Sequence, residues 1–127
     1  MTLAYLLDTN VISELARREP VPGVEGRVVA HQAVAAISAP TVEELVFGVA
    51  RLLPSARREM LDRWLEGILA GFDLLPFDAK AALWLGRERA RLASLGRTVG
   101  RADGEIAAIA ATNGLILVTR NLAGKLV

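Results

Sequence analysis

The sequence predicts an α/β fold in which helices cover a central parallel sheet. Short apolar runs typical of buried strands alternate along the chain with longer stretches whose apolar residues recur at helical spacing. This alternation indicates a parallel sheet, because each helix returns the chain to the start of the next strand. With 127 residues, 53% of them apolar, the chain is long enough to bury one core, so we predict a single domain spanning residues 1–127.

Four runs are predicted to be strands, and longer stretches between and around them to be helices. The strands are LAYLL at 3–7, AAIS at 35–38, LLPF at 74–77 and LILVT at 115–119. The helices are predicted at 9–18, around 26–35, and at 41–53, 55–72, 78–96 and 102–114. Pro54 separates two of these helices because proline interrupts helical hydrogen bonding, and Gly96 and Gly114 are placed to end two others.

Composition excludes several classes of function. The chain has no cysteine, which removes thiol nucleophiles, disulfides and Cys-ligated zinc, and its single histidine, His31, is assigned no role. No apolar run approaches the roughly 18 residues needed to span a bilayer, and no signal-peptide core precedes Asp8, so we expect a cytoplasmic protein that makes no membrane contact. Trp64 and Trp84 lie in amphipathic stretches, where packing is expected rather than base stacking.

Three carboxylates occupy related places in the predicted fold. Asp8 ends the first strand, Glu44 lies in the first turn of the helix after AAIS, and Asp103 opens the helix before LILVT. In an open parallel sheet the ligand crevice lies beyond the carboxyl ends of the strands. We therefore predict that Asp8, Glu44 and Asp103 converge there.

Helix capping offers a second interpretation of the same residues. Asp8 and Asp103 have the residue type and position of N-caps, and Thr41 with Glu44 matches a T-x-x-E capping box. Spacing alone favours capping, because helix caps are common and metal sites are rare.

Four blocks of sequence resemble the PIN-domain family, most closely its VapC and FitB toxins. They are LLDTNVISEL, SAPTVEELVFGV, ADGEIAAIA and LILVTRN, in this order over nearly the whole chain. The resemblance implies a Rossmann-like α/β/α sandwich whose acidic residues bind Mg²⁺ or Mn²⁺ and cut RNA, leaving 5′-phosphate and 3′-hydroxyl ends. It assigns Asp8, Glu44 and Asp103 to the metal, and Asn10 and Thr119 to supporting polar positions. Glu43 is excluded because adjacent helical residues point about 100° apart.

The chemistry of magnesium agrees with such a cluster. Mg²⁺ prefers carboxylate oxygen and keeps several waters, so acids without histidine or cysteine are a suitable ligand set. The chain departs from the family at the fourth acid, whose two alternative positions hold Asn121 and Gly124. Asn121 can offer a carbonyl oxygen, a weaker ligand than a carboxylate. We therefore expect one metal ion, bound with low affinity.

The resemblance also implies partners. RNA is the expected substrate, a VapB- or FitA-type antitoxin the expected inhibitor, and DNA a partner only through the antitoxin. A stripe of mostly small residues on helix 79–95 predicts a homodimer; its members are Ala79, Leu83, Gly86, Ala90 and Ala93. Arginines that are candidates to hold RNA phosphates are Arg87, Arg89, Arg91, Arg97, Arg101 and Arg120, and the alternative is a solvated basic face balanced by Glu88.

Three functions remain open from the sequence. The first is a metal-dependent ribonuclease that acts as the toxin of a type II toxin–antitoxin pair. The second is a PIN-fold module with a weakened site that mainly binds an antitoxin and joins a DNA-bound regulatory complex, as the uncharged Asn121 and Gly124 suggest. The third is a phosphatase of the haloacid-dehalogenase type, which needs a second aspartate where this chain has Asn10.

Overall fold

A computed structural model describes residues 2–120 and contains the predicted parallel sheet. Its strands are β1 (Tyr5–Leu7), β2 (Ala35–Ser38), β3 (Asp73–Leu75) and β4 (Ile116–Val118). They are hydrogen-bonded in the order β3-β2-β1-β4, and every pairing is parallel. In the central register Leu7 lies opposite Ile37 on one side and Val118 on the other, so β1, β2 and β4 end level with one another.

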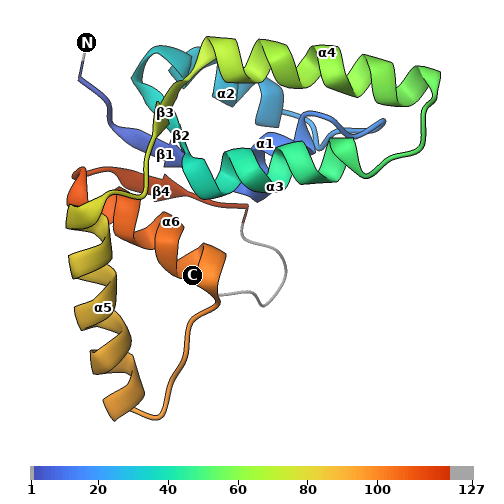
Figure 1. The fold of residues 1–127 in the computed structure, drawn as a ribbon. Helices are drawn as coiled ribbons and strands as arrows, with labels where there is room; N and C mark the ends of the chain where they lie inside the picture. Colours follow the sequence, from blue (N-terminus) through green and yellow to red (C-terminus); the bar gives the residue numbers. More distant parts are fainter. Residues whose placement is uncertain (1, 121–127) are drawn as a thin grey trace.

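The helices follow the predicted order, with shifted ends. They are α1 (Thr9–Glu14), α2 (Val24–His31), α3 (Ala39–Ala50), α4 (Ala56–Gly71), α5 (Ala79–Ser94) and α6 (Arg101–Thr112), and the short 3-10 helix η1 (Gln32–Val34) leads into β2 (Figure 1). The helix predicted at 9–18 is shorter than expected and ends at Glu14. The helix predicted around 26–35 begins at Val24 and stops at His31, because the chain must reach the fully buried strand β2.

Helices cover both faces of the sheet, which gives the predicted α/β/α sandwich (Figure 1). Leu7 and Ile37 pack with apolar residues of α1, α2, α3 and α4 on one face. Leu6 and Ala36 point to the other face and pack with α5 and α6. Successive strand residues point to opposite faces, so these short apolar runs contribute to both cores.

The strand order places a crevice at one end of β1. The chain adds β2 and then β3 on one side of β1, and finally adds β4 on its other side. Such a reversal is the topological switch point at which open α/β sheets bind ligands, beyond the carboxyl ends of the strands. Asp8 follows β1 and Thr119 follows β4, so both lie at this point.

The outer surface of α5 bears on the predicted homodimer. All members of the small-residue stripe are exposed, including Leu83 at 61%, because α5 packs on α6 through its other face. The stripe is therefore accessible on the surface of the part of the chain that the structure describes, and the homodimer stays a prediction. Trp64 and Trp84 pack against the two cores, as predicted. Within the described part of the chain, no helix has both the length and the apolar character needed to cross a membrane.

Candidate active site

Asp8 connects the sheet to α1 at the switch point. Its backbone N–H donates to the Val118 carbonyl at 2.9 Å, which extends the β1–β4 pairing by one residue. Its carboxylate caps α1, where Oδ1 accepts from the Thr9 N–H at 2.8 Å. The capping interpretation of Asp8 is therefore confirmed. An ionised carboxylate has about four acceptor sites, so this single bond leaves Asp8 able to bind a cation as well.

Glu44 is not part of a capping box. Helix α3 begins at Ala39, and its N-cap is Ser38, whose Oγ accepts from the Thr41 N–H at 3.3 Å. Pro40 suits the first turn of a helix because that position needs no N–H donor. The interpretation of Thr41 as a cap is wrong, and Glu44 lies in the second turn, exposed to solvent, rather than in the first.

Three hydroxyl groups, linked by hydrogen bonds into a chain, lead to the carboxylate of Glu44. Thr9 Oγ1 donates to Glu44 Oε1 at 2.8 Å and lies 3.0 Å from Thr41 Oγ1, and Ser38 Oγ donates to Thr41 Oγ1 at 3.2 Å. Each hydroxyl has one hydrogen, so Thr41 must be the donor to Thr9. The hydroxyls of Ser38, Thr41 and Thr9 therefore donate in sequence toward the Glu44 carboxylate. Bonds in such a chain polarise and strengthen one another.

Thr9 ties two of the three predicted acids together. Its N–H holds Asp8 and its hydroxyl holds Glu44, although Thr9 and Glu44 are 35 residues apart. The side chains of Ser38 and Thr41 that support this link are fully buried. Thr9 was assigned no role from the sequence, although its position next to Asp8 in LLDTN could have indicated one.

Asp103 approaches the same edge from the opposite layer. Helix α6 begins at Arg101 with Gly100 as its N-cap, so the interpretation of Asp103 as the cap is wrong. The exposed Asp103 lies in the first turn. Because α6 runs back to the start of β4, its first turn points to the carboxyl edge of the sheet (Figure 1). Helices α3 and α6 also contact each other, although they cover opposite faces.

The donor chemistry at this edge fits a hard divalent cation. Asp8, Glu44 and Asp103 offer only oxygen, as Mg²⁺ and Mn²⁺ prefer. Across residues 2–120, however, no three or more His, Cys, Asp or Glu side chains are gathered closely enough to hold a metal ion. The convergence of the three acids on one ion thus stays a prediction. Asn121 and Gly124, at the positions of the fourth acid, lie outside the described residues.

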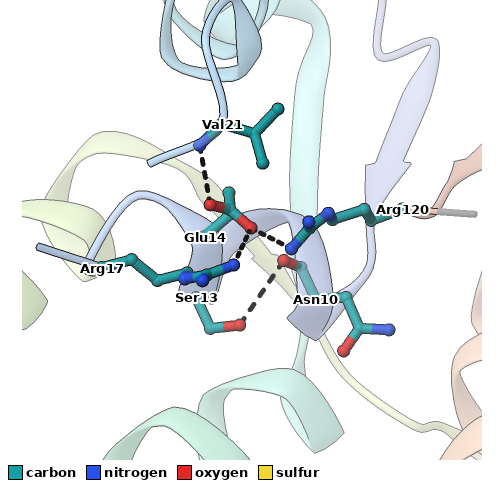
Figure 2. Close-up of polar contacts among 6 residues, drawn as sticks. All are labelled: Asn10, Ser13, Glu14, Arg17, Val21 and Arg120. Atoms are coloured by element: carbon teal, nitrogen blue, oxygen red, sulfur yellow. Dashed lines mark hydrogen bonds and ion pairs between the residues drawn. The ribbon is translucent and has the colours of Figure 1, made fainter. Parts of the chain in front are cut away.

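Glu14 is a buried charged residue that the sequence analysis missed. It is 1% exposed, at the end of α1. Its carboxylate accepts from the Val21 N–H at 2.9 Å, from Arg17 at 3.3 Å and from Arg120 (Figure 2). The Val21 N–H and, more weakly, the two arginines hold the pKa of Glu14 below its ordinary value of 4.5, against the opposing effect of burial. The burial of Glu14 could have been inferred from the sequence, because this glutamate lies one turn beyond Val11, on the apolar face of its helix.

The other predicted site residues have varied surroundings. Asn10 and Thr119 are half-buried near the switch point. Arg97 is exposed, and Arg101 is 86% exposed although it pairs with Glu105 at 3.4 Å. Arg120 is held by Glu14, so its charge is already compensated within the protein.

A groove leads away from Glu44 between α1, α3 and α4. Its volume is about 270 Å³, and apolar side chains including Leu45, Leu61 and Trp64 line it together with Thr9 and Glu44. The groove therefore joins a mainly apolar surface to one of the acidic residues.

Comparison with known proteins identifies the family. The family model described as PIN domain matches residues 5–123. The chain belongs to the PIN-domain family. The PIN domain is similar to the VapC ribonuclease Y4jK of Sinorhizobium fredii, with 40% identity over 121 residues that cover 91% of this chain and 86% of the relative.

Solved structures agree with this assignment. The structure of FitAcB from Neisseria gonorrhoeae matches the PIN domain with a TM-score of 0.85 and 38% identity, over 92% of this chain and 87% of that one. The DNA-bound VapBC structure from Salmonella typhimurium matches with a TM-score of 0.81 and 32% identity, over 92% and 86% of the two chains. These likenesses confirm the α/β/α fold and the resemblance to VapC and FitB.

Proposed function

We propose that this PIN domain is a metal-dependent ribonuclease that acts in the cytoplasm as the toxin of a type II toxin–antitoxin pair. The observation that carries the proposal is the link through Thr9, which joins the Asp8 and Glu44 carboxylates at the switch point of the sheet. A helix cap needs only the first of these bonds. The second holds an exposed acid beside another acid, against their electrostatic repulsion.

In this proposal Asp8, Glu44 and Asp103 hold one Mg²⁺ or Mn²⁺ ion, with Asn121 as a weaker fourth ligand. When bound, a divalent ion lowers the pKa of a coordinated water and stabilises the charge that develops as a phosphodiester is attacked. The protein's own part is to fix the acids. Thr9 orients two of them, and its hydroxyl is fixed in turn by Thr41.

Other residues have supporting roles in the proposal. Asn10 in α1 and Thr119 after β4 lie near the switch point, and we assign them supporting polar roles that add no charge. Arg97 and Arg101 flank the segment that leads to Asp103, and both are exposed, so we propose that they hold RNA phosphates, Arg101 by leaving its surface pair with Glu105. Phosphate contacts of this kind position an RNA strand without reading its sequence.

Cleavage of mixed RNA by purified protein tests this function. We expect cleavage with Mn²⁺ and none with a chelator, and products with 5′-phosphate and 3′-hydroxyl ends. Asp8→Asn should abolish cleavage because it removes one of the charges that hold the ion. Cleavage that persists in the chelator, or undiminished in Asp8→Asn, would show that the acidic cluster is not the catalytic centre.

The two neighbouring glutamates of α3 provide a matched comparison. Glu43 and Glu44 are both exposed. Of these two glutamates, only Glu44 is hydrogen-bonded to Thr9 within residues 2–120. We expect Glu44→Gln to slow cleavage by about 100-fold or more, the scale on which a lost charge-stabilising group slows an enzyme. Glu43→Gln should leave the rate within about twofold. Equal effects of the two substitutions would contradict the assignment of Glu44.

The partners follow from the groove and from the relatives. We propose that an antitoxin segment lies in the groove beside Glu44 and inserts a basic side chain among the acids, which would replace the charge of the ion. The complex would reach DNA through the antitoxin, as the DNA-bound VapBC relative suggests. We propose a homodimer through the exposed stripe of α5. Light scattering tests the dimer, and Ala90→Glu at the centre of the stripe should give a monomer.

A second candidate function has its own support in the sequence. The fourth acid of the family is replaced by Asn121 and Gly124, which favours a module that mainly binds an antitoxin and has little activity. Absence of RNA cleavage at saturating Mn²⁺, together with a stable complex between the chain and its antitoxin, would favour this alternative.

A further inference from the structure

Three separate segments of the chain meet at the carboxylate of Glu14. The Val21 N–H comes from the connection between α1 and α2, Arg17 comes from the residues just after α1, and Arg120 follows β4 (Figure 2). The Glu14 side chain is inaccessible to solvent, so these partners take the place of water around its charge. Buried charges persist only where they are paired and hydrogen-bonded.

The two arginines differ in how they depend on Glu14. Arg17 lies three residues from Glu14, and its side chain is 55% exposed, so solvent can stabilise its charge if the pair is lost. Arg120 lies 106 residues away along the chain, and its side chain is only 29% exposed. The charge of Arg120 therefore depends on Glu14 more than the charge of Arg17 does.

One acid of the candidate active site, Asp8, lies close to the segment that carries Arg120. Val118 pairs with Leu7 and accepts from the Asp8 N–H at 2.9 Å, so the end of β4 lies beside Asp8. Arg120 follows two residues later, just beyond the end of β4. Figure 2 shows its side chain extending along α1, on the side of Asn10, toward Glu14. Because Arg120 lies two residues beyond the Val118 carbonyl that binds Asp8, we infer that its side chain, once released from Glu14, can turn toward Asp8 instead.

We propose that Glu14 is a positioning residue that holds Arg120 away from Asp8 and Glu44 and thereby keeps the acidic site free for a divalent cation. This inference rests on the proposed metal-dependent function. An arginine fork binds a carboxylate with two parallel hydrogen bonds, so Arg120 released beside these acids would compete directly with the ion. Glu14 prevents this competition because it offers a buried carboxylate on the far side of α1.

Glu14→Gln is the substitution that tests the idea with least disturbance. Glutamine has the same shape, and its carbonyl oxygen can still accept from the Val21 N–H. It loses the charge that holds Arg120. We expect Mn²⁺ affinity, measured by calorimetry on the full chain without RNA, to fall by about tenfold or more, as for other lost charge pairs.

Further variants distinguish two explanations of a change in Mn²⁺ affinity: release of Arg120, or a general change in the electrostatic field of the protein. Arg120→Gln alone should bind Mn²⁺ within about threefold of the wild type, and Glu14→Gln combined with Arg120→Gln should recover that affinity, because no arginine is left to compete. Arg17→Gln is the matched control, since it removes the exposed arginine from the same carboxylate, and its affinity should not change. The expected signature is strong non-additivity in the double-mutant cycle.

Several results would overturn the proposal. Wild-type affinity in Glu14→Gln would do so, and so would a double variant that binds as weakly as Glu14→Gln. Additive effects, with Arg120→Gln and Arg17→Gln both tightening binding, would indicate a field effect instead. If Glu14→Gln does not fold by circular dichroism, Glu14→Asp shortens the side chain by one methylene and weakens its hold on Arg120. A loss of Mn²⁺ affinity in Glu14→Asp that Arg120→Gln does not restore would then refute the proposal. Absence of Mn²⁺ binding by the wild type would instead refute the proposed metal-dependent function, and this inference with it.

Discussion

Substitution of Thr41 by valine tests whether the hydroxyl chain stabilises the site. Valine has nearly the same shape as threonine and suits the same backbone, but it has no hydroxyl. Thr41 is fully buried and lies in the middle of the chain, where it accepts from Ser38 and donates to Thr9. Its own N–H, which binds Ser38 Oγ, is unaffected. The substitution therefore removes two hydrogen bonds and no packing volume.

The expected cost follows from what each neighbour loses. The buried Ser38 hydroxyl is left as a donor without its acceptor, which costs about 1–3 kcal/mol. Thr9 loses one accepted bond but still donates to Glu44, a net loss of about 0.5–1.5 kcal/mol. Thr41→Val should therefore lower the free energy of unfolding by about 1.5–4.5 kcal/mol.

Urea unfolding followed by circular dichroism measures this change. Thr112→Val is the matched control, because the Thr112 hydroxyl donates only to the Ala108 carbonyl within its own helix, at 2.8 Å. It should cost less than about 1 kcal/mol. Thr41→Ser restores the hydroxyl and should recover most of the lost stability. If Thr41→Val unfolds at the same urea concentration as the wild type, the hydroxyl chain does not stabilise this site.

Further predictions concern packing, the fourth ligand position and pH. A Cβ at Gly104 would lie 3.1 Å from a side-chain carbon of Leu85, so Gly104→Leu should separate α5 from α6 and destabilise the protein by about 1–3 kcal/mol. Gly67 has open space around it, so Gly67→Ala should stabilise the protein by about 0.5–1 kcal/mol. Thermal unfolding of both variants measures these changes. Asn121→Asp should tighten Mn²⁺ binding measured by calorimetry, and unchanged affinity would exclude Asn121 as a ligand position. Because the Val21 N–H and, more weakly, the arginines lower the pKa of Glu14 from 4.5, its ionised form stabilises the folded state fully above about pH 4.5, and this stability is lost as the pH falls through the lowered pKa. The unfolding free energies of wild type and Glu14→Gln should therefore converge as the pH falls below about 4.5, and a constant difference would contradict this reasoning.

Local sequence signals predicted the elements of the fold but not all of their ends. The AAIS strand was predicted with its observed bounds. The start of α3 was misplaced because Thr41 and Glu44 match a capping box, whereas Ser38 and Pro40 together start the helix earlier. Asp103 was misread in a similar way, since the helix begins before it, at Arg101.

The sequence predicted only those features of the candidate site that follow from the position of a residue in a strand or helix. The placement of Asp8 followed from the end of an apolar strand. The link between Thr9 and Glu44 depends on a tertiary contact across 35 residues, and the pairing of Glu14 with Arg120 on one across 106 residues. One sequence without coordinates gives no signal for such pairs, which arise only when the strands assemble.

The central claim is that Asp8, Glu44 and Asp103 bind one divalent ion. The most direct test is a crystal structure of the full chain with Mn²⁺, in which anomalous scattering locates the ion. We expect one strong peak at the switch point, with oxygens of the three carboxylates at about 2.1 Å, the distance at which Mg²⁺ binds oxygen. A peak elsewhere, or carboxylates more than about 10 Å apart with no ion between them, would contradict it.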